Sequence, residues 1–164
     1  MDQAHIHLAI THLPLFASFS GILILLYGIK TKSNHTQLAA FGIFIISAIG
    51  ACIAYATGEG AEEKVEDIPG IIKSVIDRHE DSAIFTLLSF ILTGIVSIAA
   101  AFLNFKKYAH AQRATLSVLV ISVLSFILVA RTAWLGGQIR HTEISTVSQT
   151  GNNQAGENTE DEDE

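Results

Sequence analysis

The chain has little of what stabilises or identifies a small soluble domain. Its 164 residues include one cysteine and two prolines, and only 16% of them are charged. A single cysteine excludes an intramolecular disulfide and a cysteine-rich metal site. The net charge of −6 argues against a nucleic-acid partner, because a phosphate-binding surface would be basic. The chain also lacks a nucleophile–base pair and a phosphate-binding glycine loop, so whether it is an enzyme stays open.

What the chain has instead is long apolar runs. Hydrophobic residues make up 49% of it and the mean hydropathy is +0.42, which is too apolar for an ordinary soluble domain. Each run is roughly 17–23 residues long, enough for a helix to cross about 30 Å of hydrocarbon. In lipid the backbone must satisfy its own hydrogen bonds, so each run should be a helix. The predicted spans are residues 13–29, 38–57, 83–105 and 114–136.

Charge is distributed unevenly over the segments between these spans. The two short loops contain no Asp or Glu, and their charged residues are Lys30, Lys32, Lys106, Lys107 and Arg113. Positively charged loops stay in the cytoplasm, so both termini should lie outside. We predict an all-α, up-down-up-down four-helix bundle within residues 1–141, in a bacterial inner (plasma) membrane. Residues 142–164 are polar and acidic, which indicates a disordered tail.

The long outer loop, residues 58–82, is expected to carry some structure of its own. Residues 61–67 favour a short acidic helix that ends at Pro69-Gly70. Beyond it a second stripe falls at helical spacing: Ile72, Ile76, His79 and Ala83. We expect this stripe to lie on the membrane surface and then to turn into the third span, so that His79 faces neighbouring helices.

Histidines gather at the predicted outer ends of the helices. His5, His7 and His12 precede the first span, His79 precedes the third, and His141 follows the fourth. His5 and His12 are seven residues apart and share a helix face, whereas His7 points elsewhere. Imidazoles from different helices can bind haem iron axially, or can bind Zn, Cu or Fe. We expect His12 and His79 to face inward and to be axial ligands of b-type haem, with His141 as an alternative.

Carboxylates and one arginine complete the candidate site. Glu59 and Glu63 follow the second span, and a mixed metal site would use His5, His7, His12, Glu59, Glu63, His79 and His141. Arg131 lies within the fourth span, where an arginine pairs with an anion or extends to the interface. Glu59, Glu63 or a haem propionate would be its partner. The simpler alternative is that the acidic loop and the interfacial histidines are only solvated.

Three stretches carry a family resemblance: His5-Ile-His-Leu-Ala-Ile-Thr-His12-Leu-Pro14, His79-Glu-Asp-Ser-Ala83 and Gly136-Gly-Gln-Ile-Arg-His141. Together they resemble an uncharacterised group of bacterial four-helix membrane proteins, a predicted membrane domain of unknown function. The resemblance covers most of residues 5–143 and implies a four-helix bundle. The family positions it implies are His12, Pro14, His79, Gly136, Gly137 and His141. That architecture looks like small membrane cytochromes of the b type, although the Glu-rich loop departs from the pattern and leaves a metal ion open.

Three hypotheses about function follow. The first is a haem protein for electron transfer, with His12 and His79 as ligands and a redox protein as partner. The second is a metal-binding or metal-handling protein for Zn, Cu or Fe. The third is a structural subunit that holds no cofactor and packs against a larger membrane complex. The lipid bilayer is a partner in all three.

Overall fold

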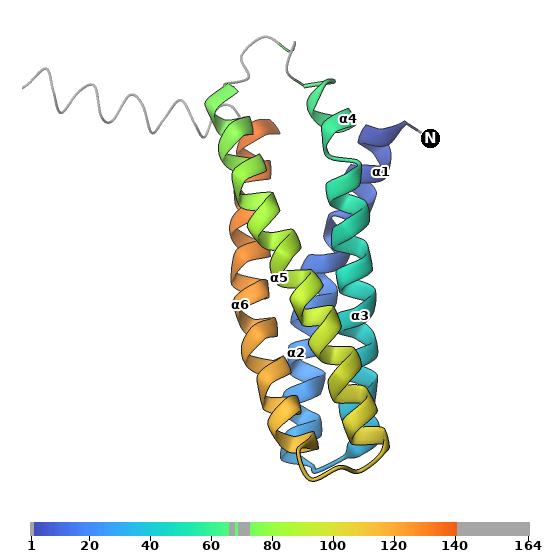
Figure 1. Ribbon diagram of the computed structural model, residues 1–164. Coiled ribbons are helices and arrows are strands. Elements are labelled where there is room, and N and C mark those ends of the chain that lie inside the picture. Colours follow the sequence, from blue (N-terminus) through green and yellow to red (C-terminus); the bar gives the residue numbers. More distant parts are fainter. Residues whose placement is uncertain (1, 66–67, 69–72, 141–164) are drawn as a thin grey trace, which may run out of the picture.

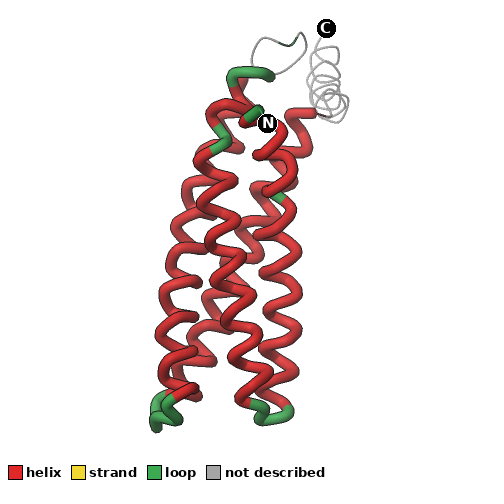
Figure 2. Tube along the Cα trace, turned by 90° about the vertical axis from the view of Figure 1, so that its right-hand side faces the viewer, coloured by secondary structure: helices red, strands yellow, loops and turns green. Residues whose placement is uncertain are grey.

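The computed structural model describes residues 2–65, 68 and 73–140, and this part of the chain is almost entirely helical (Figures 1 and 2). Its four long helices are α2 (His12–Lys30), α3 (Asn34–Ala56), α5 (Lys73–Phe105) and α6 (Ala111–Arg140). Two short helices accompany them, α1 (Gln3–Ile10) before α2 and α4 (Glu59–Glu62) after α3. The predicted all-helical fold is therefore confirmed, and the described part contains no strand.

Four helical stretches are long and apolar enough to cross a membrane, one at each predicted span. They are Gln3–Lys30, Asn34–Ala56, Lys73–Phe105 and Ala111–Ile139. Their outer surfaces suit a lipid solvent, because large apolar side chains such as Phe16, Phe85 and Trp134 are more than half exposed. By helix length and composition this is a membrane-spanning protein.

The start of α5 corrects one prediction. The helix runs without interruption from Lys73 to Phe105, so the segment carrying His79 continues the third span instead of lying flat and turning into it. The reason is that neither proline nor glycine occurs between Lys73 and Thr93. At 1.5 Å per residue the helix is about 50 Å long, so its charged first turns extend well beyond about 30 Å of hydrocarbon.

The acidic helix predicted over residues 61–67 is shorter and begins earlier, as α4. Residues 66–67, Pro69-Gly70 and Ile72 lie outside the described residues, as do His141 and the tail 142–164.

Two hairpins make up the bundle, α2 with α3 and α5 with α6, and α3 packs against α5 to join them. The two short turns lie at one end, which carries Lys30, Lys32, Lys106 and Lys107 and is called the lysine end below. The opposite end carries α1 and α4 and is called the histidine end. In Figure 1 the hairpins come together at the lysine end, whereas the ends of α5 and α6 lie apart from α1, α3 and α4 at the histidine end.

The buried residues repeat in the same spacing in both hairpins. In α2 they include Pro14, Ser18, Gly21, Leu25 and Gly28, and α5 matches them with Thr86, Phe90, Thr93, Ser97 and Ala100. In α3 they include Ala40, Phe44, Ser47 and Ala51, and α6 matches them with Val118, Ser122, Ser125 and Val129. The two hairpins thus share one spacing of buried residues.

The apolar core occupies the lysine end and the middle of the bundle. One cluster is centred on Phe41, Phe44 and Val118, and a second contains Ala48, Ala51, Phe90 and Val129. Neither cluster reaches the histidine end, where Ile76 of α5 and Leu135 of α6 are also buried.

Candidate functional site

His7 lies on α1 and reaches the end of α3. Its Nδ1 atom is 2.8 Å from the carbonyl oxygen of Ala54. A carbonyl oxygen only accepts a hydrogen bond, so Nδ1 carries a proton, and in the neutral ring the lone pair is on Nε2. One turn after Ala54, Gly58 lies beside the ring, and a Cβ atom there would be 3.7 Å from His7 Cε1. Within the described residues Nε2 of His7 has no hydrogen-bond partner.

His79 on α5 is held in the same way by α6. Its half-buried ring places Nδ1 at 3.0 Å from the carbonyl oxygen of Thr132. One turn later comes Gly136, where an added Cβ would lie only 3.0 Å from Cε1 and 3.2 Å from Nδ1 of the ring. The absence of a side chain at Gly136 therefore makes room for the imidazole. Nε2 again has no hydrogen-bond partner in the part of the chain that the structure describes.

The two histidines form a matched pair. His7 comes from α1, just before the first helix of its hairpin, and His79 comes from the first helix, α5, of the other. Each donates Nδ1–H to a carbonyl of the second helix of its hairpin, and each lies against the glycine one turn further on. A backbone carbonyl on Nδ1 is the usual arrangement behind a histidine that binds a metal through Nε2. The pair therefore offers two oriented nitrogen ligands at one end of the bundle.

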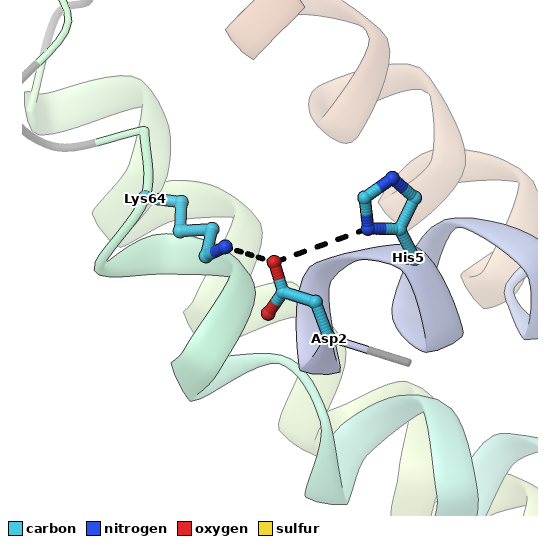
Figure 3. A network of polar contacts seen from close by, with 3 residues as sticks. All are labelled: Asp2, His5 and Lys64. Carbon is cyan, nitrogen blue, oxygen red and sulfur yellow. Dashed lines mark hydrogen bonds and ion pairs between the residues drawn. The ribbon is translucent and has the colours of Figure 1, made fainter.

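Polar contacts hold α1, and with it His7, against the rest of the histidine end. Figure 3 shows Lys64, just after α4, in an ion pair with Asp2, and Asp2 Oδ2 is also 3.9 Å from His5 Nδ1. Gly60 adds to this, because its missing side chain leaves room for Gln3. The ion pair is exposed and contributes at most about 1 kcal/mol, so its value is to position α1.

A cluster of buried hydroxyl groups lies one turn below His79, and sequence reasoning missed it. Thr132 Oγ1 is 2.7 Å from Ser82 Oγ and 2.8 Å from Thr86 Oγ1. These bonds fix α5 on α6 at the residue whose carbonyl oxygen accepts from His79. The signal in the sequence was that Ser and Thr recur in both helices at the intervals of the buried helix face.

The structure places His12 differently from the prediction. Its side chain is exposed, and its ring lies 6.3 Å from that of Phe16, centroid to centroid, so the inward orientation was wrong. His5 is exposed too, as a face shared with His12 requires. The inward face of this segment instead carries His7, followed at seven-residue intervals by Pro14, Gly21 and Gly28. Small residues at that spacing mark where membrane helices approach closely.

The remaining predicted site residues lie away from the pair. Glu59 and Glu63 are exposed at α4. Arg131 is exposed as well, and its Nη1 lies 3.5 Å from Ser82 Oγ, the long limit for a hydrogen bond. Between the described residues, Arg131 makes no ion pair with a carboxylate, and no group of three or more His, Cys, Asp or Glu is arranged to hold a metal ion.

Fold and site together define a helical membrane-spanning protein with a histidine pair at one end. No protein-family model, curated protein or solved structure matches the chain. The resemblance to the four-helix membrane family therefore stays a prediction.

Proposed function

We propose that His7 and His79 hold b-type haem and that the protein transfers electrons within a membrane. The observation that carries the proposal is the matched geometry of the pair, with both Nδ1–H groups bound to helix carbonyls and both Nε2 atoms available. His79 keeps the role expected from the sequence. His7 takes the role expected of His12, because His12 is exposed on the opposite face.

The donor set suits haem well. Haem iron receives four nitrogens from the porphyrin and takes two axial ligands, and two imidazoles are a common axial pair. When bound, haem would supply a one-electron redox centre. The chain would hold it, orient both imidazoles and, through the bonds from Nδ1 to the carbonyls, raise their basicity as ligands.

Arg131 is the residue we propose to balance a propionate. It is one residue before Thr132, so it lies beside the helix turn that holds His79, and its Nη1 already contacts Ser82 Oγ. A guanidinium near the edge of the hydrocarbon is stabilised by an anion at that depth. Of the three partners expected for Arg131, the propionate is the one we propose, because Glu59 and Glu63 are exposed near α4, in the other hairpin.

We further propose that the histidine end faces outward from a bacterial inner membrane. The support is the concentration of basic residues at the other end, which favours a cytoplasmic location for the lysine end. The N-terminus, and the C-terminal end of α6, would then lie outside. A redox protein that exchanges electrons with the haem would approach from that side.

Absorption spectroscopy of protein purified in detergent after growth with added haem precursor tests the proposal. We expect a Soret band and, on reduction, the sharp visible bands of six-coordinate low-spin haem. His7→Ala and His79→Ala should each remove the low-spin spectrum. His12→Ala is the matched control, since it removes an exposed histidine from the same segment, and should leave the spectrum unchanged. No Soret band in the wild type would refute haem binding, and a loss caused by His12→Ala alone would refute the ligand assignment.

Metal handling is the second candidate, and the same pair supports it. Two neutral imidazoles bind Zn, Cu or Fe ions, with further ligands from solvent or substrate. Elemental analysis of the same preparation distinguishes the two functions. Stoichiometric metal without porphyrin, lowered by His7→Ala and His79→Ala, would favour metal handling over haem. A preparation with neither group would favour a structural subunit.

A further inference from the structure

The seam between α5 and α6 is lined by buried hydroxyl and amide groups along most of its length. Layers of paired polar side chains succeed one another from the histidine end towards the lysine end. They are the Ser82, Thr86 and Thr132 cluster, then Thr93 with Ser125 at 2.9 Å, then Asn104 with Thr115 at 3.1 Å. In a membrane small polar residues allow helices to approach closely, and their hydroxyl groups bond across the seam or to their own helix.

Ser97 breaks this pattern. Its side chain is fully buried, and its Oγ atom has no hydrogen-bond partner among the described residues. Ser89, Thr93 and Ser122 each donate to a carbonyl of their own helix three or four residues earlier. Ser97 does not make this bond. An unpaired buried hydroxyl costs about 1–3 kcal/mol, which calls for a partner.

The register of the two helices places Ser122 opposite Ser97. Thr93 pairs with Ser125 on one side of this layer, and Asn104 pairs with Thr115 on the other. Counting along α5 from Thr93 and Asn104, and along α6 from Ser125 and Thr115, places Ser97 level with Ser122. Ser122 is also fully buried, and its hydroxyl proton is used at 2.9 Å by the Leu119 carbonyl, which leaves its oxygen free to accept.

We propose that a single buried water molecule bridges Ser97 and Ser122 inside the bundle. The water accepts the Ser97 hydroxyl proton and donates one of its own to Ser122 Oγ. Both bonds satisfy groups that are otherwise incompletely paired, and buried waters occupy sites of this kind in proteins. The next buried residues towards the lysine end, Ala100 of α5 and Val118 of α6, belong to an apolar cluster. This site is independent of the histidine pair.

Water-edited solid-state NMR on the whole protein in lipid, with 13C-labelled serine, tests for the water directly. Magnetisation from water should reach the Ser97 Cβ signal, which is assigned by its loss in Ser97→Ala. Ser47 is the internal control, because it is equally buried but donates to the Pro14 carbonyl at 3.1 Å and needs no water. In Ser122→Ala the transfer to Ser97 should fall to the level seen for Ser47. Transfer to Ser97 no greater than to Ser47 in the wild type would overturn the proposal.

Unfolding measurements give a second test, because a seam with the water and a dry seam predict opposite changes in the unfolding equilibrium constant of Ser97→Ala. If the water is present, Ser97→Ala removes one of its two partners, and the unfolding equilibrium constant should rise by roughly fivefold or more. If the seam is dry, the same change removes an unpaired hydroxyl group and the constant should fall. Ser20→Ala, at an exposed serine of α2, corrects for the helix preference of alanine. A fall below the Ser20→Ala value would contradict the proposal.

Discussion

Replacement of Gly136 by alanine tests the packing on which the His79 geometry depends. The added Cβ atom would lie 3.0 Å from Cε1 and 3.2 Å from Nδ1 of the ring, closer than ordinary van der Waals contact. The ring must move away from α6 by a few tenths of an ångström. That movement lengthens the 3.0 Å bond from Nδ1 to the Thr132 carbonyl oxygen. We therefore expect the variant to lose most of this hydrogen bond, which is worth about 0.5–1.5 kcal/mol.

The neighbouring glycine provides the matched control. A Cβ atom at Gly137 would have no other atom within 4 Å, so Gly137→Ala should only add helix stability. Alanine is favoured over glycine in a helix by up to about 1 kcal/mol, and both variants gain that increment. Gly137→Ala should therefore be more stable than the wild type, and Gly136→Ala should fall about 1 kcal/mol below Gly137→Ala.

Equilibrium unfolding in mixed detergent micelles, followed by circular dichroism, measures this difference. 15N NMR of the His79 ring reports on the hydrogen bond itself, since the Nδ1 shift depends on its acceptor. Equal stability of the two alanine variants, together with an unchanged Nδ1 signal, would refute the reasoning. It would mean that the His79 ring does not lie against Gly136.

Two further predictions concern the seams between helices. Thr132→Val removes the hydroxyl group to which two other buried hydroxyl groups are hydrogen-bonded, so the free energy of unfolding should fall by about 1–3 kcal/mol. The His79 bond to the backbone carbonyl should stay intact. An unfolding midpoint within error of the wild type would count against the cluster. Gly21→Ala places a Cβ atom 2.7 Å from Cε1 of the fully buried Phe44, and should destabilise the protein by about 1–3 kcal/mol. Gly42→Ala, whose added Cβ atom has no other atom within 4 Å, should not destabilise the protein. Similar unfolding midpoints for the two variants would exclude tight packing between Gly21 and Phe44.

The four long helices could be predicted from the sequence because lipid leaves the backbone few alternatives. A run of apolar residues long enough to cross hydrocarbon must form its hydrogen bonds within itself, so run length alone locates the helix. Helix ends in water are not constrained in this way. Helical spacing was expected between Ile72 and Ala83, but the unbroken continuation of this segment into the third span, which depends on the absence of a helix breaker, was missed.

The histidine pair was only half predictable. His79 was expected to face its neighbours, and it does, with its ring against α6. For the first helix, the sequence separated His7 from the face of His5 and His12, but the inward face was chosen wrongly. The better signal was the series of small residues, Pro14 and Gly21, at seven-residue spacing from His7. The carbonyl partners were beyond prediction, since they lie 47 and 53 residues from their histidines.

The two turns at the lysine end have a consequence for how the chain enters the membrane. Lys32 and Lys107 have φ values of 54° and 56°, a left-handed conformation in which glycine is less strained by of order 1 kcal/mol. Glycine at these two positions would relax both turns. It would also remove positive charge, which acts during membrane insertion because basic loops are retained in the cytoplasm. The double glycine variant should be more stable once folded, yet reach the membrane in mixed orientations. In the orientation we propose, the lysines would serve insertion at some expense to the stability of the mature fold.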